Sequence, residues 1–343
     1  MQYKNGMFGG SFDPLHIGHI NGIIQAASMC QKLYIVLSYS RIRDNIPMEQ
    51  RYRWLHNSLK HMSNVEIILL EDTASSMEEY DSKSCWESGR DYVLDKIGCA
   101  VDVVFCGSDY KGSNRYEDLY DCKVIYFDRN VIPISSTEIR KSPFKYWDYI
   151  PKICRPYYTK KVLFIGGEST GKSTLVRNLA LAYNTNYLEE VGRDICDYAG
   201  SEDLMIAEDF HEILLKHKVY ELDLIKESNR LFFVDTDALI TKWFSCFLLK
   251  DDKGKSSVEL LAEAITEINS FNLIIFLEPT VPFVQDGTRN EKIAADRKKY
   301  SEEIKELFNS HNLSYHCISG DYLERFIKTK ELINVFSNTY ELI

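Results

Sequence analysis

Residues 166–173 read GGESTGKS, and this stretch constrains the fold more than any other part of the chain. The apolar run Lys161–Ile165 precedes it, and apolar residues at helical spacing follow it over Lys172–Ala182. In a G-x-x-x-x-G-K-[ST] loop between a strand and a helix, the glycines let backbone N–H groups wrap around phosphates. The helix N-terminus adds a positive field. The sequence therefore predicts a nucleotide-phosphate loop inside a strand–helix unit.

Short apolar runs alternate with helix-like stretches along the chain of 343 residues. Such alternation predicts an α/β fold in which mostly parallel strands are covered by helices. The pattern restarts after the aromatic, proline-containing segment 142–160, and a chain of this length is expected to form about two domains. We place the boundary near Tyr158, which gives domains 1–158 and 159–343. A helix is expected at Ile17–Met29, and strands are expected at Lys32–Ser38, Val65–Leu70, Val101–Cys106, Lys123–Phe127, Lys161–Ile165, Asn186–Leu188, Leu231–Asp235 and Leu273–Leu277.

The composition narrows the class of protein. With 45% hydrophobic and 27% charged residues, the chain has the balance of a globular protein in water. A formal net charge of −10 argues against a general nucleic-acid binder, so no DNA binding is expected. The nine cysteines form no C-x-x-C pair, and no apolar run approaches the ~20 residues that span a bilayer. Since no signal peptide is recognisable either, a cytoplasmic location is expected.

A second glycine-rich stretch, GGSFDPLHIGH at residues 9–19, precedes the expected first helix. Its two histidines, His16 and His19, allow three interpretations: metal ligands, buried structural side chains, or part of a phosphate cradle at the helix start. Two histidines at this spacing are weak evidence for a metal, which would want further ligands. Residues 134–140, ISSTEIR, offer another phosphate-binding pattern, in which Ser135 begins a helix cap and Arg140 follows one turn later.

In the second half, the residues downstream of the GGESTGKS loop fit a small-molecule kinase. Asp235 ends an apolar strand in acid, which suits a metal-binding carboxylate. Glu190 follows the expected strand 186–188 and is the candidate base for a substrate hydroxyl. The segment 286–289 together with Arg297 predicts a lid whose arginines contact the transferred phosphate. Each of these charged residues also has a plainer interpretation as a solvated strand end, turn or helix face.

GGSFDPLHIGH and ISSTEIR together resemble the nucleotidyltransferase superfamily, in which H-x-G-H and I-S-S-T-x-x-R hold the triphosphate of ATP. With GGESTGKST, PMEQRYRW (47–54) and PFVQDGTR (282–289), the whole chain resembles the NadR-type bifunctional enzymes. The resemblance implies an N-terminal Rossmann-like nucleotidyltransferase domain and a C-terminal P-loop kinase domain. Some members of this family begin with a helix-turn-helix domain. Here the first phosphate loop starts at once, so a repressor role is not expected.

For the first domain, the resemblance implies that ATP adenylylates nicotinamide mononucleotide to give NAD and pyrophosphate. No protein nucleophile is needed, because positioning and charge neutralisation supply the catalysis. The expected catalytic residues are His16, His19 and Arg140. ATP is expected at Gly9, Ser11, His16, His19, Asp109, Ser135, Thr137 and Arg140. Nicotinamide mononucleotide is expected at Phe12, Arg43, Arg51 and Trp86, and Trp86 has an equally good interpretation as a core residue.

For the second domain, the resemblance implies that ATP phosphorylates ribosylnicotinamide to nicotinamide mononucleotide, so that the two reactions are consecutive. The expected catalytic residues are Lys172, Glu190 and Asp235. Mg²⁺ is expected to come with ATP and to be held by Ser173 and Asp235. ATP is expected at Gly166, Gly167, Glu168, Ser169, Thr170, Gly171, Lys172, Ser173, Thr174, Arg289 and Arg297, and ribosylnicotinamide at Glu190, Arg193 and Asp237.

Two alternatives remain open on the sequence. The phosphate motifs contact only the phosphates of a substrate and do not distinguish its other parts. Nicotinate mononucleotide or another nucleoside therefore fits them equally well. A nucleotide-sensing regulatory protein with little turnover is the alternative from another class, although the expected catalytic groups are all present. Family analogy suggests two further partners, a ribosylnicotinamide transporter at the membrane and a second copy of the chain in a homo-oligomer.

Overall fold

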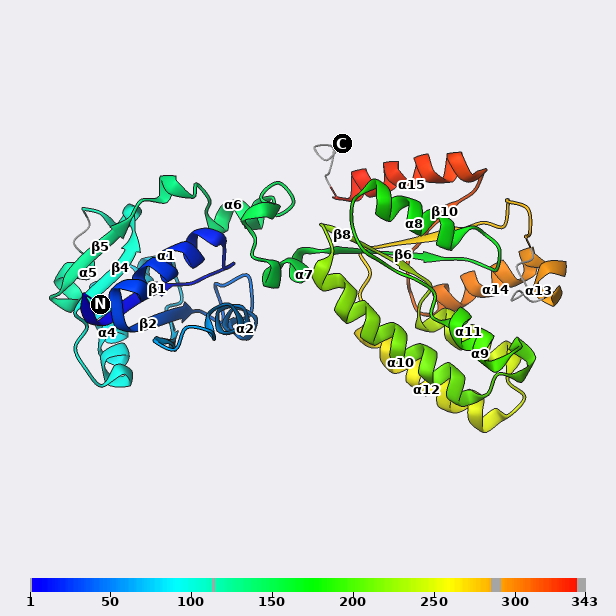
Figure 1. Cartoon of the computed structure of the whole chain (residues 1–343), viewed down its shortest axis with the longest axis horizontal. Coiled ribbons are helices and arrows are strands. Elements are labelled where there is room, and N and C mark those ends of the chain that lie inside the picture. The colour runs from blue at the N-terminus through cyan, green and yellow to red at the C-terminus, as the bar shows by residue number, and fades with distance from the viewer. Residues whose placement is uncertain (1, 113–114, 285–290, 338–343) are drawn as a thin grey trace. The chain divides into compact units, whose positions relative to one another are not determined.

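The computed structural model describes residues 2–112, 115–284 and 291–337. The chain divides into two compact units, Met1–Cys154 and Arg155–Ile343, and each is built around one five-stranded parallel sheet (Figure 1). The predicted α/β class is therefore confirmed for both units. A search of the described helices finds none with the length and hydropathy that a membrane crossing requires.

The N-terminal unit has the strand order β3-β2-β1-β4-β5, with β1 at the centre. Chain order reverses between β1 and β4, so the loops that follow these two strands lead in opposite directions. In open parallel sheets, ligands bind outside the carboxyl ends of strands at such a point. The elements are β1 (Tyr3–Gly10), α1 (Ile17–Met29), β2 (Cys30–Tyr39), α2 (Met48–Leu59), β3 (Val65–Glu71), α3 (Met77–Tyr80), α4 (Lys83–Ile97), β4 (Val103–Gly107), α5 (Arg115–Tyr120), β5 (Lys123–Phe127) and α6 (Ser136–Lys141).

The C-terminal unit has the strand order β10-β9-β6-β8-β7, again with its first long strand, β6, in the middle. The helices α10 and α12 pack against each other beside the sheet (Figure 1). The elements are α7 (Arg155–Tyr158), β6 (Lys160–Ile165), α8 (Lys172–Ala182), β7 (Tyr187–Leu188), α9 (Gly192–Ala199), α10 (Ala207–Leu224), β8 (Leu231–Asp235), α11 (Ala238–Leu248), α12 (Asp252–Ile268), β9 (Leu273–Leu277), α13 (Glu291–Ala295), α14 (Arg297–Ser310), β10 (His316–Ile318) and α15 (Tyr322–Ser337).

The predicted elements agree closely with the observed ones where the hydrophobic pattern is strong. The helices α1 and α8 and the strands β5, β8 and β9 have the predicted bounds. Strands β8 and β9 are buried along their whole length, which explains why each reads as an uninterrupted apolar run. Strand β10 was not predicted, because it is short and only Ile318 of its residues is buried.

Parallel pairing brings functional segments of the C-terminal unit together. The central strand β6 leads into the GGESTGKS loop, β8 beside it ends at Asp235, and β7 at the sheet edge leads to Glu190. Because the carboxyl ends of parallel strands lie along one edge of the sheet, these three segments become neighbours.

Candidate active sites

The first candidate site begins at the start of α1. His16 is the N-cap residue, and its Nδ1 accepts a hydrogen bond from the backbone N–H of His19 at 3.3 Å. His19 Nδ1 accepts in return from the N–H of His16 at 3.4 Å, and the two rings stack with centroids 3.6 Å apart. The H-x-G-H motif is thus a histidine version of the reciprocal capping box. A Cβ at Gly18 would lie 3.0 Å from the His16 ring, so glycine keeps the pair uncrowded.

This cap determines the chemistry of the two rings. A neutral imidazole whose Nδ1 accepts a hydrogen bond carries its hydrogen on Nε2. Burial lowers the pKa of His16 to about 4, and the nearby Arg129 charge adds to the effect. Burial also lowers the pKa of His19 well below its ordinary value, assisted by His16 and then Arg129. Both rings are therefore neutral at pH 7, and each has an Nε2–H group to donate, which suits a phosphate oxygen.

The metal interpretation of the two histidines finds no support in the described part of the chain. Residues 2–112, 115–284 and 291–337 contain no group of three or more His, Cys, Asp and Glu side chains arranged to hold a metal ion. The stacked rings also use their Nδ1 atoms on the helix start, which leaves only the Nε2 atoms for a ligand.

Helix α6 brings the ISSTEIR motif to the same loop. Ser136 Oγ donates a hydrogen bond to the carbonyl oxygen of Pro14 at 2.9 Å. Arg140 donates to the carbonyl oxygen of Asp13 and lies 3.6 Å from its carboxylate. Ser135 uses its hydroxyl for the N-cap of α6. The two sequence motifs are therefore neighbours in space, as the predicted triphosphate clamp requires.

A further cation at this site was not predicted. Arg129 follows β5 and forms an ion pair with Asp109 after β4, with Nε and Oδ1 2.9 Å apart. Both side chains are about half exposed, and the charge of Arg129 reaches both histidines. Gly107 makes the pair fit, because a Cβ there would lie 2.5 Å from Asp109 and 2.6 Å from Arg129. A basic residue just after a strand of the same sheet was the available signal for Arg129.

The two arginines predicted to bind the mononucleotide phosphate both have partners within the N-terminal unit. Arg51 on α2 is fully buried, donating to the carbonyl oxygen of Ser11 at 2.7 Å and pairing with Asp44 at 2.5 Å. Arg43 forms an ion pair with Asp72, whose side chain is largely buried. Because both guanidinium groups are engaged inside the unit, the structure assigns Arg51 to holding the loop after β1 and Arg43 to the segment after β3.

Two aromatic residues of the predicted mononucleotide site have different positions. Phe12 is completely buried and meets the His19 ring edge-on at 5.0 Å, so it packs against the histidine pair and is not available to a ligand. Trp86 on α4 is half-buried, with Tyr116 at 5.4 Å and the Arg115 guanidinium 4.6 Å from its ring centroid. Trp86 belongs to this aromatic cluster, which supports its interpretation as a packing residue.

The second candidate site is built on the loop between β6 and α8. Gly166 has φ +143°, and a Cβ there would lie 2.7 Å from the carbonyl oxygen of Leu277, so the loop requires glycine. Gly171, at φ +83°, is the N-cap residue of α8. Lys172 Nζ donates to the carbonyl oxygens of Gly166 and Gly167 at 3.0 and 3.1 Å. The lysine therefore lies over the loop, where the predicted phosphate contact would be made. Thr174 is exposed on α8.

Asp235 and Ser173 fit the predicted magnesium site. Asp235 is fully buried, hydrogen-bonds with the Ser173 side chain, and has one oxygen, Oδ2, with no partner in the described structure. Burial raises the pKa of Asp235 to about 6, although the charge of Lys172 opposes the effect. A carboxylate and a hydroxyl beside the phosphate loop are the oxygen ligands that Mg²⁺ prefers. The Oδ2 atom without a hydrogen-bond partner would gain a partner if the ion bound here.

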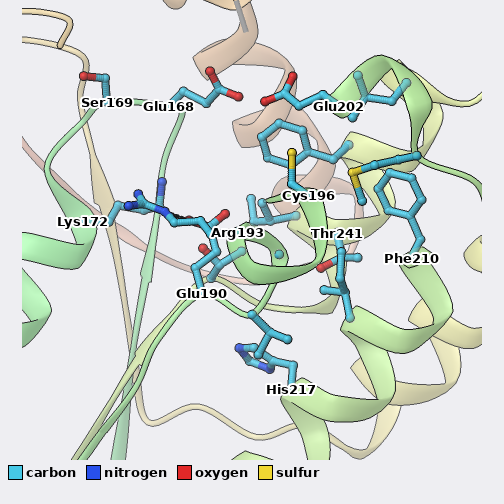
Figure 2. Close-up of a pocket in the computed structure, with 18 residues that line it drawn as sticks. Glu168, Ser169, Lys172, Glu190, Arg193, Cys196, Glu202, Phe210, His217 and Thr241 are labelled. Carbon is cyan, nitrogen blue, oxygen red and sulfur yellow. Dashed lines mark ion pairs between the residues drawn. The ribbon is translucent and has the colours of Figure 1, made fainter. Parts of the chain in front are cut away.

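A cavity opens directly from this loop (Figure 2). Glu190 lies near its polar end, 3.4 Å from Arg193, and Arg193 lies 3.5 Å from the Ser173 hydroxyl. The carboxylates of Glu168 and Glu202 point toward one another across the cavity (Figure 2). The apolar wall is formed mainly by Cys196, Met205, Phe210, Ile213, Ile240 and Phe244.

His217 on α10 also lines this cavity and was not predicted (Figure 2). Its side chain is buried, its Nε2 has no hydrogen-bond partner in the described structure, and burial lowers its pKa. The ring is therefore neutral at pH 7 and has a polar atom left to satisfy. A histidine on a helix with apolar neighbours gives no sequence signal that separates this role from a core position.

Three predicted residues of the second site remain. Asp237 is buried as the N-cap of α11, accepting from the N–H of Ile240 at 3.2 Å, and it does not line the cavity. The prediction that it binds the nucleoside is corrected to a capping role. Arg297 donates to the carbonyl oxygens of Ser169 at 3.0 Å and Val281 at 2.7 Å, so here it holds the phosphate loop. Arg289 lies outside the described residues.

Comparison with known families finds one family match in each of the two units. Residues 7–142 match the cytidylyltransferase-like family, and residues 161–325 match an AAA domain family. Over a short part, 21% of the chain, the sequence is 37% identical to a phosphopantetheine adenylyltransferase of Streptococcus pneumoniae. Two solved structures share the fold with a TM-score of 0.81: a NadR protein in complex with NR, 22% identical, and one in complex with NAD and AMP-PNP, 20% identical. Each match covers 98% of this chain and 96% of the solved one.

Two curated relatives extend over nearly the whole chain. The trifunctional NAD biosynthesis/regulator protein NadR of Salmonella typhimurium is 30% identical over 97% of this chain and 83% of its own length. The NadR protein of Escherichia coli is 30% identical over 96% of this chain and 82% of its own length. With a nucleotidyltransferase domain, a P-loop domain and this extent of similarity, the chain belongs to the NadR family of NAD biosynthesis proteins.

Proposed function

We propose that this chain makes NAD in two consecutive steps. The C-terminal unit transfers the γ-phosphoryl group of ATP to ribosylnicotinamide, giving nicotinamide mononucleotide and ADP. The N-terminal unit then joins that mononucleotide to the AMP part of a second ATP, giving NAD and pyrophosphate. The observation that carries the proposal is the cavity of the C-terminal unit, which is lined both by Lys172 of the phosphate loop and by apolar side chains suited to a flat ring.

In the kinase step, the acceptor hydroxyl lies where the cavity meets the phosphate loop. Glu190, at that junction, takes the proton of the 5′-hydroxyl as its oxygen bonds to the γ-phosphorus. Lys172 exchanges its two loop carbonyls for phosphate oxygens, and loop N–H groups complete the cradle. Ser173 and Asp235 would hold Mg²⁺, which would neutralise phosphate charge when bound.

The rest of the cavity fits the nicotinamide end of the acceptor. Phe210 and Phe244 provide aromatic surface, while Glu168 and Glu202 place acidic groups near a ring that carries a positive charge in ribosylnicotinamide. His217 gives a buried polar atom that a substrate hydroxyl or amide satisfies. The NadR structure in complex with NR supports the same substrate class.

In the adenylyl transfer step, the chain positions and neutralises phosphates. The Nε2–H groups of His16 and His19 donate to the triphosphate, and Arg140 and Arg129 bring positive charge to the same loop. The phosphate of nicotinamide mononucleotide attacks the α-phosphorus of ATP, and pyrophosphate leaves with the electrons of the broken bond. No group of the protein becomes covalently attached, so the rate depends on geometry and charge.

Two variants separate the steps, and each is the control for the other. Purified protein is incubated with MgATP and ribosylnicotinamide, and mononucleotide and NAD are quantified separately. Lys172→Ala should abolish mononucleotide formation while NAD is still made from added mononucleotide. His19→Ala should stop NAD formation while mononucleotide accumulates.

The outcomes distinguish the alternatives. If the wild-type protein makes neither product, the enzyme assignment is wrong and a nucleotide-sensing protein is favoured. If either variant loses both activities, the two-site description fails. Assays with nicotinate riboside and uridine in place of ribosylnicotinamide test the acceptor, and a higher kcat/KM for either would move the assignment to that nucleoside.

A further inference from the structure

Arg325 on α15 is a buried cation whose bonds all go to neutral groups. Its side chain is only 2% exposed. Nη1 donates to the carbonyl oxygen of Thr170 in the phosphate loop, Nε to that of Gly320 at 2.9 Å, and Nη2 to that of Glu278 at 2.6 Å. Nη2 also donates to the hydroxyl of Thr280 at 2.7 Å. No carboxylate among the described residues forms an ion pair with it.

A second arginine holds the neighbouring residue of the loop. Arg297 on α14 donates to the carbonyl oxygen of Ser169 at 3.0 Å. Two guanidinium groups from separate helices therefore hydrogen-bond to the consecutive loop carbonyls of Ser169 and Thr170. In a trans peptide, the carbonyl of one residue and the N–H of the next share a plane and point in opposite directions, so fixing the carbonyls of Ser169 and Thr170 also fixes the N–H groups of the residues that follow them. Those N–H groups are the ones that bind phosphates in a loop of this type.

The charge of Arg325 needs a counterpart. A buried cation is costly unless it is paired, and its neutral partners supply hydrogen bonds without a negative charge. Burial is the largest influence on the pKa of Arg325 and lowers it, and Arg297 lowers it further, whereas Tyr322 and the Glu278 carboxylate act in the opposite direction. A triphosphate on the other side of the loop would add negative charge within the range of a weakly screened interaction, where no carboxylate pairs with Arg325 directly.

We propose that Arg325 is a positioning residue of the kinase: it fixes the Thr170 carbonyl so that the loop is preformed for ATP phosphates, and the bound triphosphate balances its charge. This inference rests on the proposed function only in placing ATP at this loop. It adds a residue at the far end of the chain to the machinery of phosphate binding, without direct contact with the nucleotide.

The test compares Arg325→Met, which removes the charge, and Arg325→Lys, which keeps it without the planar fork. Lys328→Met is the matched control, because Lys328 lies one turn further along α15 and, within the described part of the chain, donates only to the carbonyl oxygen of Ser319. In the full chain, the KM for ATP, the KM for ribosylnicotinamide and kcat are measured, with NAD formation from added mononucleotide as an internal check of folding.

We expect Arg325→Met to raise the KM for ATP about 10- to 100-fold, the range for losing one charge-assisted hydrogen bond. Arg325→Lys should recover part of that loss, and Lys328→Met should resemble wild type. The KM for ribosylnicotinamide should change less than about twofold, whereas general damage to the unit would raise both constants. A normal KM for ATP in Arg325→Met, or an equal rise in both constants, overturns the proposal.

A binding measurement keeps this test independent of the acceptor substrate. In a His19→Ala background, where the N-terminal site is disabled, ATP is titrated calorimetrically into protein that keeps Arg325 and into protein with the Arg325→Lys or the Arg325→Met substitution. If the protein that keeps Arg325 binds ATP at this site but does not phosphorylate ribosylnicotinamide, the proposed function fails and the Arg325 inference is still decided by the Kd series. An unchanged Kd in Arg325→Lys and Arg325→Met refutes it.

Discussion

Replacing Asp235 with asparagine should stabilise the C-terminal unit while removing its kinase activity. Asp235 is completely buried, and burial is the main cause that raises its pKa from 3.8 to about 6. That difference corresponds to about 3 kcal/mol of unfavourable free energy for the ionised form, at about 1.4 kcal/mol per pKa unit. Asparagine has nearly the same shape without the charge. In the proposed mechanism, binding of magnesium and nucleotide would offset this cost in the wild-type protein.

The pH dependence gives this prediction its sign. Because the folded protein holds the Asp235 proton more tightly than the unfolded chain, the penalty is fully present above the folded pKa of about 6. It disappears as the pH falls below the unfolded value of 3.8. Asp235→Asn should therefore exceed wild type in free energy of unfolding by about 3 kcal/mol at pH 7.5, as an upper estimate, and the two proteins should converge near pH 4.

Hydrogen exchange of the peptide that contains β8, followed in increasing urea, reports the unfolding of this unit alone. Asp223→Asn is the matched control, since Asp223 is an exposed carboxylate of the same unit with 64% of its side chain accessible. Kinase turnover should fall at least about 100-fold in Asp235→Asn only, as expected for losing a metal-binding group of the phosphoryl-transfer site. A variant that is less stable than wild type at pH 7.5, or a difference that does not shrink on acidification, would refute this reasoning.

Three other changes test the description of the sites. Arg51→Met should cost the N-terminal unit about 3 kcal/mol in urea unfolding, because it breaks a buried ion pair, and a loss below about 1 kcal/mol would contradict the anchoring role. The lowered pKa of His16, about 4 against 6.5, predicts that the unit loses up to about 3 kcal/mol as the pH falls from 6.5 to 4, and His16→Gln should flatten that decline. Gly166→Ala, which places a Cβ 2.7 Å from the carbonyl oxygen of Leu277, should abolish kinase activity while NAD formation from added mononucleotide persists.

The sequence by itself determined the two phosphate loops and the α/β class. In both loops the chemistry is carried by adjacent residues, namely glycines with special backbone angles, a following helix start, and a histidine or lysine at fixed spacing. Such information is local, so it can be read in GGESTGKS and GGSFDPLHIGH without knowing the fold. The buried strands were equally clear, because burial on both faces leaves an unbroken apolar run, as in β8 and β9.

The tertiary structure decided which charged and polar residues serve those loops. Arg51 and Asp237 were predicted to contact ligands. In the structure both are buried, and Arg51 hydrogen-bonds to the loop after β1 while Asp237 caps α11. His217 and Arg325 gave no signal and Arg129 only its place after a strand, because each acts on a segment distant in the sequence. Whether an arginine meets solvent, a carboxylate or a backbone carbonyl depends on long-range packing of the parallel sheets, and no local pattern records it.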